Sequence, residues 1–126
     1  MTNKRDFTVF EYQYRDAANF KAQGNILLAG TTSRKDHDAL IQSLDSGEYF
    51  VAEQVKIPVL YEILYIYSDG PTADDHAFHE FMEMRPATPN KIKTLTLWGS
   101  VTELMATFQE AKNKWDVRHS PHYYIS

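Results

Sequence analysis

The middle of the sequence contains the residues best suited to carry out chemistry. Residues 72–85 include two of the five histidines, His76 and His79, and four carboxylates. In a helix, the two histidines share one face with Glu80 and Glu83, where they could bind a metal ion or act as general acid and base. In a strand, His76 and Glu80 point to one side, and His79 and Glu83 point to the opposite side. The local conformation therefore decides whether these side chains can act together.

We favour the extended conformation for residues 73–85, because large apolar side chains alternate within this stretch and the chain needs partners for its other strands. The helical alternative stays open, since Ala, Glu and Met are good helix formers. In that alternative, His76, His79 and Glu80 are candidate ligands for zinc or iron. Such a site needs three or four converging nitrogen or oxygen ligands at about 2.0–2.2 Å. In the extended conformation we expect no cofactor.

A second group of polar residues, at the end of the first expected strand, could bind an anion. It consists of Tyr14, Arg15, Asp16 and Lys21. Arg15 and Lys21 carry the charges that would receive a phosphate or a carboxylate. The alternative that we favour is structural: Asp16 and Asn19 order a turn, and Arg15 forms an ion pair with an acid such as Asp16.

The C-terminal residues contain a second histidine pair and an aromatic end. His119 and His122 have the same spacing as the central pair, but Pro121 prevents a regular helix between them. With Tyr123 and Tyr124, residues 117–126 are too rich in aromatic side chains for a free end. We expect these tyrosines to contact the body of the protein or a second copy of the chain.

The sequence lacks the common signatures of catalysis. It has no Gly-x-Ser-x-Gly motif, and both Ser33 and Ser100 are explained as helix caps. It has no glycine-rich phosphate loop between a strand and a helix. An enzyme is therefore the less favoured interpretation.

Composition and charge restrict the class of protein. The 126 residues are 43% hydrophobic and 13% aromatic, which is typical of a single folded domain covering residues 1–126. The net charge is −4 and the basic residues are scattered, so nucleic-acid binding is not expected. Residues 57–67 are too short to cross a membrane. The absence of cysteine and of a signal peptide after Met1 favours a cytoplasmic location.

The pattern of the remaining chain predicts the elements that position these side chains. Residues 7–14 and 23–31 read as a hairpin of two strands, and residues 91–98 read as a further strand. Ser33 opens a helix that Gly47 ends, and Ser100 opens another. A middle helix begins at Pro58 and buries an apolar stripe formed by Leu60, Ile63, Leu64 and Tyr67. The predicted fold is α+β: an antiparallel sheet of about four strands with two to three helices packed on one face.

Four short blocks resemble a family of small uncharacterised bacterial proteins. The blocks are YRDAANFK, LDSGEYF, QVKIP and DDHAFHE, at residues 14–21, 44–50, 54–58 and 74–80. The resemblance covers about the first two thirds of the chain. It implies a bacterial, cytoplasmic protein and assigns no activity.

Together these observations favour a non-catalytic, acidic protein that acts through contact with another protein or through self-association as a homodimer. A neutralising or immunity-type binder of a basic toxin or nuclease would fit, because charge complementarity accelerates association. The alternative is a metal-binding module or metal-dependent hydrolase that uses the region of His76 and His79.

Overall fold

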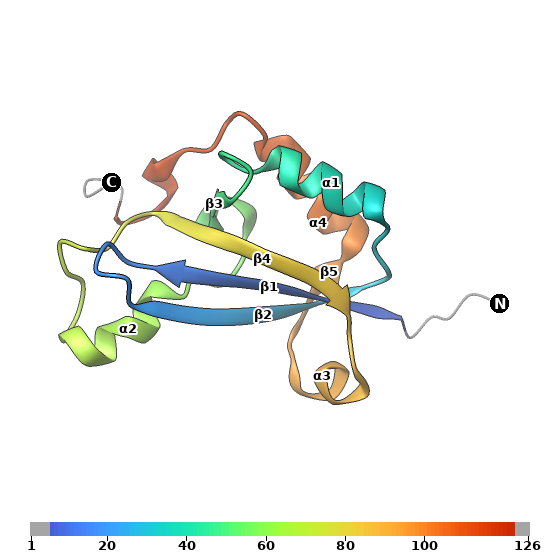
Figure 1. Cartoon of the computed structure of the whole chain (residues 1–126), viewed down its shortest axis with the longest axis horizontal. Coiled ribbons are helices and arrows are strands. Elements are labelled where there is room, and N and C mark those ends of the chain that lie inside the picture. The colour runs from blue at the N-terminus through green and yellow to red at the C-terminus, as the bar shows by residue number, and fades with distance from the viewer. Residues whose placement is uncertain (1–5, 123–126) are drawn as a thin grey trace.

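The computed structural model describes residues 6–122 of the chain (Figure 1). The strands are β1 (Phe7–Arg15), β2 (Lys21–Ala29), β3 (Tyr49–Val51), β4 (Phe78–Pro86) and β5 (Leu97–Ser100). The α-helices are α1 (Arg34–Ser43), α2 (Tyr61–Ser68), α3 (Pro89–Thr94) and α4 (Val101–Ala111). Two short 3-10 helices cover Ala52–Val55 and Val117–His119. No helix in this part of the chain is long and apolar enough to pass through a membrane.

The strands form one mixed sheet in the order β3-β4-β1-β2-β5. The expected hairpin of β1 and β2 is confirmed, with Phe7 opposite Ala29 and Arg15 opposite Lys21. Strand β4 pairs antiparallel with both β1 and β3, whereas β5 runs parallel to β2. The α+β class is therefore confirmed. The expected sheet of about four antiparallel strands and two to three helices is corrected to five mixed strands and four α-helices within the described residues.

Two helices begin where the sequence predicted. Ser33 caps α1 by accepting a hydrogen bond from the Asp36 N–H, and the Asp36 carboxylate accepts one from the Ser33 N–H. Ser100 and Glu103 form the same reciprocal pair at the start of α4. Each pair satisfies two backbone groups that the first helical turn would otherwise leave without partners. The end of α1 was predicted less well, because the helix stops at Ser43, ahead of the Gly47 turn.

The prediction of a strand over residues 91–98 is wrong for residues 91–96 and holds only for Leu97 and Trp98. Helix α3 occupies the first part of this stretch, because Pro89 suits the first helical turn and Thr88 caps it by accepting a hydrogen bond from the Lys91 N–H. The strand that follows, β5, is only four residues long. The local capping signal in the turn therefore prevailed over the strand propensity of the following threonines and leucines.

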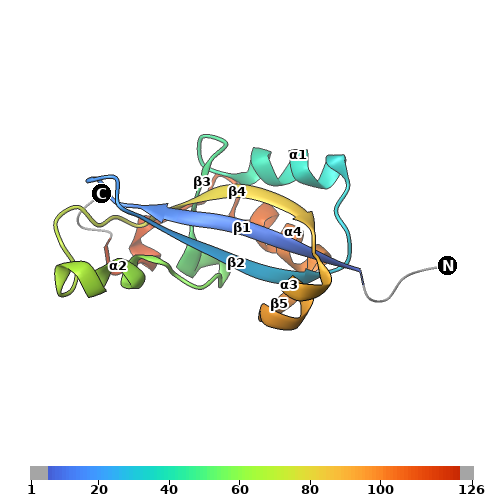
Figure 2. The same cartoon turned by 60° about the horizontal axis from the view of Figure 1, so that its bottom comes forward.

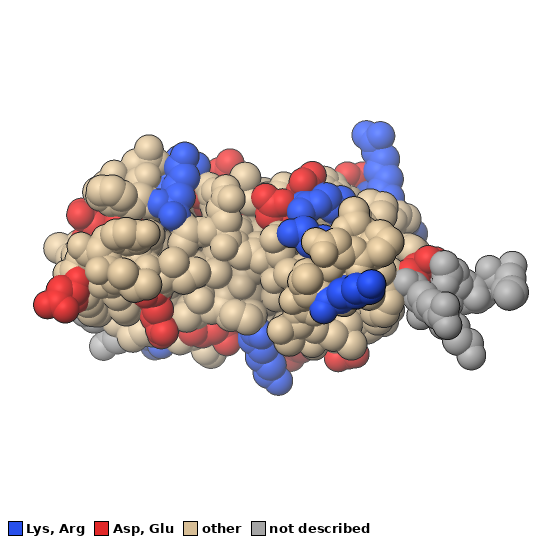
Figure 3. All heavy atoms as spheres, turned by 90° about the horizontal axis from the view of Figure 1, so that it is seen from below, with Lys and Arg blue, Asp and Glu red and all other residues tan. Residues whose placement is uncertain are grey.

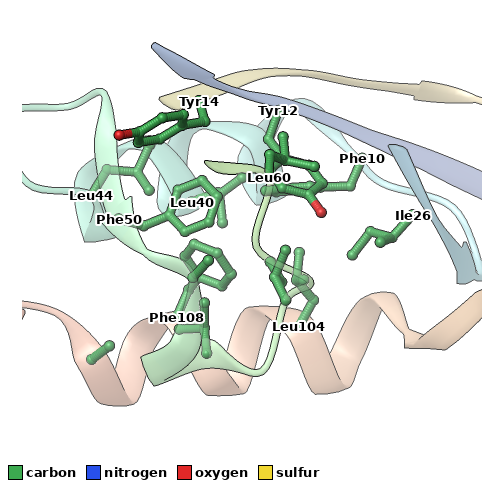
Figure 4. Close-up of a cluster of buried hydrophobic side chains, with 14 of the residues drawn as sticks. Phe10, Tyr12, Tyr14, Ile26, Leu40, Leu44, Phe50, Leu60, Leu104 and Phe108 are labelled. Atoms are coloured by element: carbon green, nitrogen blue, oxygen red, sulfur yellow. The ribbon is translucent and has the colours of Figure 1, made fainter. Parts of the chain in front are cut away.

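Aromatic rings fill the space between the sheet and the helices α1 and α4 (Figure 4). Phe50 lies at the centre of this core, with ring centroids 6.1 Å from Phe10, 6.0 Å from Tyr12 and 5.5 Å from Phe108. Such edge-on and tilted contacts are favoured by the charge distribution of aromatic rings. The core extends along the sheet to the end at which β1 turns into β2.

Helix α2 lies at that end of the sheet in both cartoon views (Figures 1 and 2). Gly24 allows the chain before α2 to cross β2 closely, because a Cβ atom at Gly24 would lie 2.7 Å from the Leu60 side chain. The Tyr12 O–H also donates a hydrogen bond of 2.6 Å to the Pro58 carbonyl. These contacts fix residues 58–60 ahead of the helix, so the helix expected to begin at Pro58 begins at Tyr61 instead.

Candidate functional site

Most of the residues selected from the sequence gather at the end of the molecule that carries α2. The end of β1, the turn into β2, helix α2, residues 69–77 and the start of β4 all meet there (Figures 1 and 2). The Ala17 N–H donates a 3.0 Å hydrogen bond to the Asp74 carbonyl and so joins the turn to the segment that precedes β4. Residues distant in the sequence thus form one surface.

The turn between β1 and β2 has the structural role that we favoured for it. The Asp16 carboxylate accepts a hydrogen bond of 2.9 Å from the Phe20 N–H, and Asn19 adopts a positive φ of 69°. Arg15 forms its ion pair with Glu80, at 3.3 Å, rather than with Asp16. Lys21 begins β2 with its side chain exposed.

The favoured strand is confirmed for Phe78–Pro86 and includes His79, but His76 lies in the irregular segment before it. The expectation that the two imidazoles point to opposite sides of a strand is therefore wrong. Both rings lie against the Tyr14 ring, at centroid distances of 5.1 Å for His76 and 5.3 Å for His79. The period of a strand does not apply to His76, because the regular backbone has not yet begun.

The ring nitrogens of the two histidines have different partners. His76 Nε2 lies 2.6 Å from the Arg15 carbonyl, and its Nδ1 accepts a hydrogen bond from the Phe78 N–H. His79 is fully buried, and its Nε2 accepts a hydrogen bond from the Leu60 N–H. His79 Nδ1 makes no well-formed hydrogen bond within residues 6–122. Burial, with a smaller effect from His76, lowers the pKa of His79 to about 3.

The proposed metal ligands therefore face different partners. Glu80 pairs with Arg15 and accepts a hydrogen bond from the Gln13 amide, whereas His79 is directed toward the backbone of Leu60. Among the residues that the structure describes, no three or more His, Asp or Glu side chains are placed to hold a metal ion.

Tyr14 connects the sheet to the segment before β4. Its O–H donates a hydrogen bond of 2.6 Å to the buried Asp75 carboxylate, and its oxygen accepts one from the His76 N–H. The other Asp75 oxygen accepts a hydrogen bond from the Thr72 N–H. Burial and the Asp75 carboxylate both raise the pKa of Tyr14 above its ordinary value. Tyr14 is thus a structural tyrosine that fixes residues 72–76.

Replacing Tyr14 with phenylalanine is expected to destabilise the protein by about 1–3 kcal/mol, because Asp75 and the His76 N–H each lose a buried partner. The free energy of unfolding, measured in urea at pH 7, tests this expectation. The matched variant Tyr67→Phe alters an exposed ring and should change stability by less than about 0.5 kcal/mol. Equal stability of both variants and the natural protein would contradict the structural role of Tyr14.

The C-terminal histidine pair does not converge on one point. His122 is buried against Tyr61, with ring centroids 4.4 Å apart, and its Nε2 is hydrogen-bonded to the Tyr65 hydroxyl. His119 is exposed. Tyr123 and Tyr124, which we predicted to contact the body of the protein or a second copy, lie outside the described residues.

Helix α2 differs most from its prediction, because it carries apolar side chains on both faces. Tyr61 is buried and Leu64 is half-buried, facing the protein. Ile63, Ile66 and Tyr67 form a second stripe at spacings of three and four residues. Ile63 and Tyr67, which were predicted to face the core, are thus on the outside.

The second stripe continues onto the β1–β2 turn through Phe20. The exposed fractions are 66% for Phe20, 46% for Ile63, 82% for Ile66 and 86% for Tyr67. We call these four residues the α2 outer patch. They are four of the six large hydrophobic side chains exposed within the described residues, the others being Met82 and Leu97. A helix that is apolar on all sides is normally covered on all sides.

A pocket of about 150 Å³ opens beside the patch. Phe20, Leu64 and Tyr67 supply its apolar wall, and three aspartates, Asp16, Asp74 and Asp75, supply its polar wall. Two further acids are exposed near Ile66: Glu62 in the first turn of α2 and Asp69 directly after the helix. In the space-filling view, the end of the molecule that carries α2 is largely uncharged, with acidic groups along its outer margin and one basic side chain on the same face (Figure 3).

A scan against family models found no match for this chain, and searches of curated proteins and of solved structures also found none.

Proposed function

We propose that this protein is a binding domain whose α2 outer patch docks onto a basic segment of another protein. The observation that carries the proposal is the exposed apolar stripe of α2, which continues onto Phe20 and is bordered by carboxylates. Protein interfaces commonly have an aromatic and aliphatic centre with a charged margin. The described surface therefore supports binding to a partner with apolar and cationic side chains.

Charge argues against a second copy of the chain as the occupant. A symmetric dimer through this patch would place the same surface on both sides of the contact. Asp16, Asp69 and Asp74 would then face the acids of the other copy, and like charges across an interface oppose association. A basic partner would instead gain attraction at the same positions, and the net charge of −4 would accelerate its approach.

The size of the patch indicates the affinity to expect. Burying a large apolar side chain contributes about 1.5–3 kcal/mol, so Phe20, Ile66 and Tyr67 together could contribute roughly 5–9 kcal/mol. Loss of translational and rotational freedom offsets much of this gain. We therefore expect a dissociation constant in the micromolar range or weaker for a short peptide, on the order of 1 μM to 1 mM.

A peptide-display selection tests the proposal. Random twelve-residue peptides are selected on the natural protein, and each enriched peptide is then assayed against an Ile66→Glu variant. We expect enriched peptides to combine apolar residues with Lys or Arg, and to bind Ile66→Glu at least tenfold more weakly. The variant should keep its stability within about 0.5 kcal/mol, because Ile66 is exposed.

Met82→Glu is the matched control, because Met82 is an exposed apolar residue on β4, outside the patch. It should bind the selected peptides as the natural protein does. Enriched peptides that bind Ile66→Glu undiminished would contradict the proposal, as would a selection that enriches nothing. A natural protein that forms dimers at micromolar concentration, and an Ile66→Glu variant that does not, would assign the patch to self-association instead.

A further inference from the structure

We infer that the pocket beside α2 receives one Lys or Arg side chain from the partner, so that a single cationic residue anchors the bound segment. This inference rests on the proposed function and specifies the chemistry that the partner must present. It follows from the two kinds of wall that the pocket combines.

One wall suits the apolar stem of a long basic side chain. Phe20, Leu64 and Tyr67 line it, and the two rings are among the most exposed aromatic groups in residues 6–122. Lys and Arg bury their methylene chains along apolar surfaces while the charged end stays in polar surroundings. Aromatic faces also attract a cation placed over them.

The other wall suits the charged end. The Ala17 N–H to Asp74 carbonyl bond joins the turn that contains Asp16 to the backbone of Asp74, and the buried Asp75 carboxylate accepts hydrogen bonds from Tyr14 and Thr72. The Asp16 carboxylate, which accepts the Phe20 N–H, and the Asp75 carboxylate are therefore positioned before any ligand arrives, which reduces the entropy lost on binding. An anionic or purely apolar side chain would leave them without a partner of opposite charge.

The volume is consistent with one side chain. A cavity of about 150 Å³ accommodates a molecule of the size of benzene, and the pocket measures about 150 Å³. The pocket is too small to receive a helix of the partner. Any larger element of the partner would therefore contact the α2 outer patch. The pocket would select the residue type, and the patch would supply most of the buried area.

Three small probes separate charge from shape. Nα-acetyl-lysine amide and Nα-acetyl-arginine amide carry a cationic group on an apolar stem, and Nα-acetyl-norleucine amide has the stem alone. Each is titrated into the protein while NMR follows the Leu64 methyl and the Phe20 and Tyr67 ring signals. At least one cationic probe should bind no less than fivefold more tightly than norleucine amide, and the difference should shrink at high salt.

Variants of the acidic wall provide the control. Asp74→Asn should weaken the cationic probes about threefold to fivefold and leave norleucine amide unchanged. Asp38→Asn removes the same charge from an exposed position on α1 and should leave all three probes unchanged. Equal binding of norleucine and cationic probes, or no response of the pocket signals to any probe, would overturn the inference.

The two proposals can fail separately. If selected peptides depend on Ile66 while no cationic probe enters the pocket, the docking surface stands and the anchor residue is wrong. If the cationic probes bind but no selected peptide depends on Ile66, the pocket stands as a cation site and the docking function is wrong.

Discussion

Acidification from pH 7 to pH 4.5 is expected to lower the free energy of unfolding by about 3 kcal/mol through His79 alone. Burial lowers the pKa of His79 from 6.5 to about 3 in the folded protein. The unfolded chain therefore binds a proton near pH 6.5, while the folded protein does not until the pH approaches 3. The contribution of His79 to the free energy of unfolding is fully present above pH 6.5. It is lost as the pH falls toward 3, to a total of about 5 kcal/mol.

The structural cause is the environment of the ring. His79 Nε2 accepts the Leu60 N–H, so protonation at Nε2 would remove a hydrogen bond as well as bury a charge. The rings of Tyr14, Tyr61 and Phe50 surround the imidazole at centroid distances of 5.3, 5.9 and 6.0 Å. Protonation would therefore break the hydrogen bond that joins β4 to the residue before α2.

A variant without this imidazole tests the prediction. His79→Gln should be less stable than the natural protein at pH 7, and the difference should decrease steadily between pH 6.5 and pH 4.5. His119→Gln replaces an exposed histidine and should follow the natural protein across the range. Urea unfolding at several pH values gives the comparison. Parallel stability curves for the natural protein and His79→Gln would show that His79 is not held neutral by the fold.

Replacing Phe50 with alanine should destabilise the protein by about 3–5 kcal/mol, which is the cost of removing a buried phenylalanine ring and leaving a cavity. Phe50 is fully buried, and its ring lies within 6.5 Å of the rings of Phe10, Phe108 and Trp115. The side chain thus connects β3 to β1, α4 and the segment after α4. A loss of this size is a large fraction of the stability of a small domain, about 5–15 kcal/mol.

The same substitution at Phe20 is the control, because its ring is 66% exposed. Phe20→Ala should change the free energy of unfolding by less than about 0.5 kcal/mol. The two variants remove the same atoms, so their difference isolates the effect of burial. Thermal or urea unfolding that gave equal losses for Phe50→Ala and Phe20→Ala would contradict the assignment of core and surface at the two positions.

The parts of the fold that follow from short-range rules could be predicted from the sequence. The reciprocal caps at Ser33 and Ser100 are local, and both helices begin at the expected residue. The hairpin of β1 and β2 follows from two strand-like runs joined by a turn with Asp16 and Asn19. These features depend on residues a few positions apart, and later packing does not change them.

The parts that depend on long-range packing were predicted less well. Helix α2 has apolar residues on every side, so its sequence does not say which stripe faces inward. Gly24, Tyr12 and His79 decide this, because they fix residues 58–60 from elsewhere in the chain. The outer patch could have been suspected from the surplus of apolar residues in α2, but its position next to Phe20 required the structure.

The candidate site shows the same division. Arg15, Asp16 and His76 were selected from the sequence and do meet at one end of the molecule, where they line a common pocket with Glu80. Asp16 bonds to the turn, Arg15 pairs with Glu80, and His76 bonds to the Arg15 carbonyl, so these contacts are chiefly structural. The surface that we propose for binding lies beside them and includes Ile63 and Tyr67, which hydrophobic periodicity placed in the core.

The most direct test of the docking surface is the NMR footprint of the tightest selected peptide on the natural protein. We expect the largest shifts at Ile63, Ile66, Tyr67 and Phe20, and no effect at Met82 and Leu97. A footprint centred on Leu97 and Trp98, or on the open face of the sheet, would contradict it.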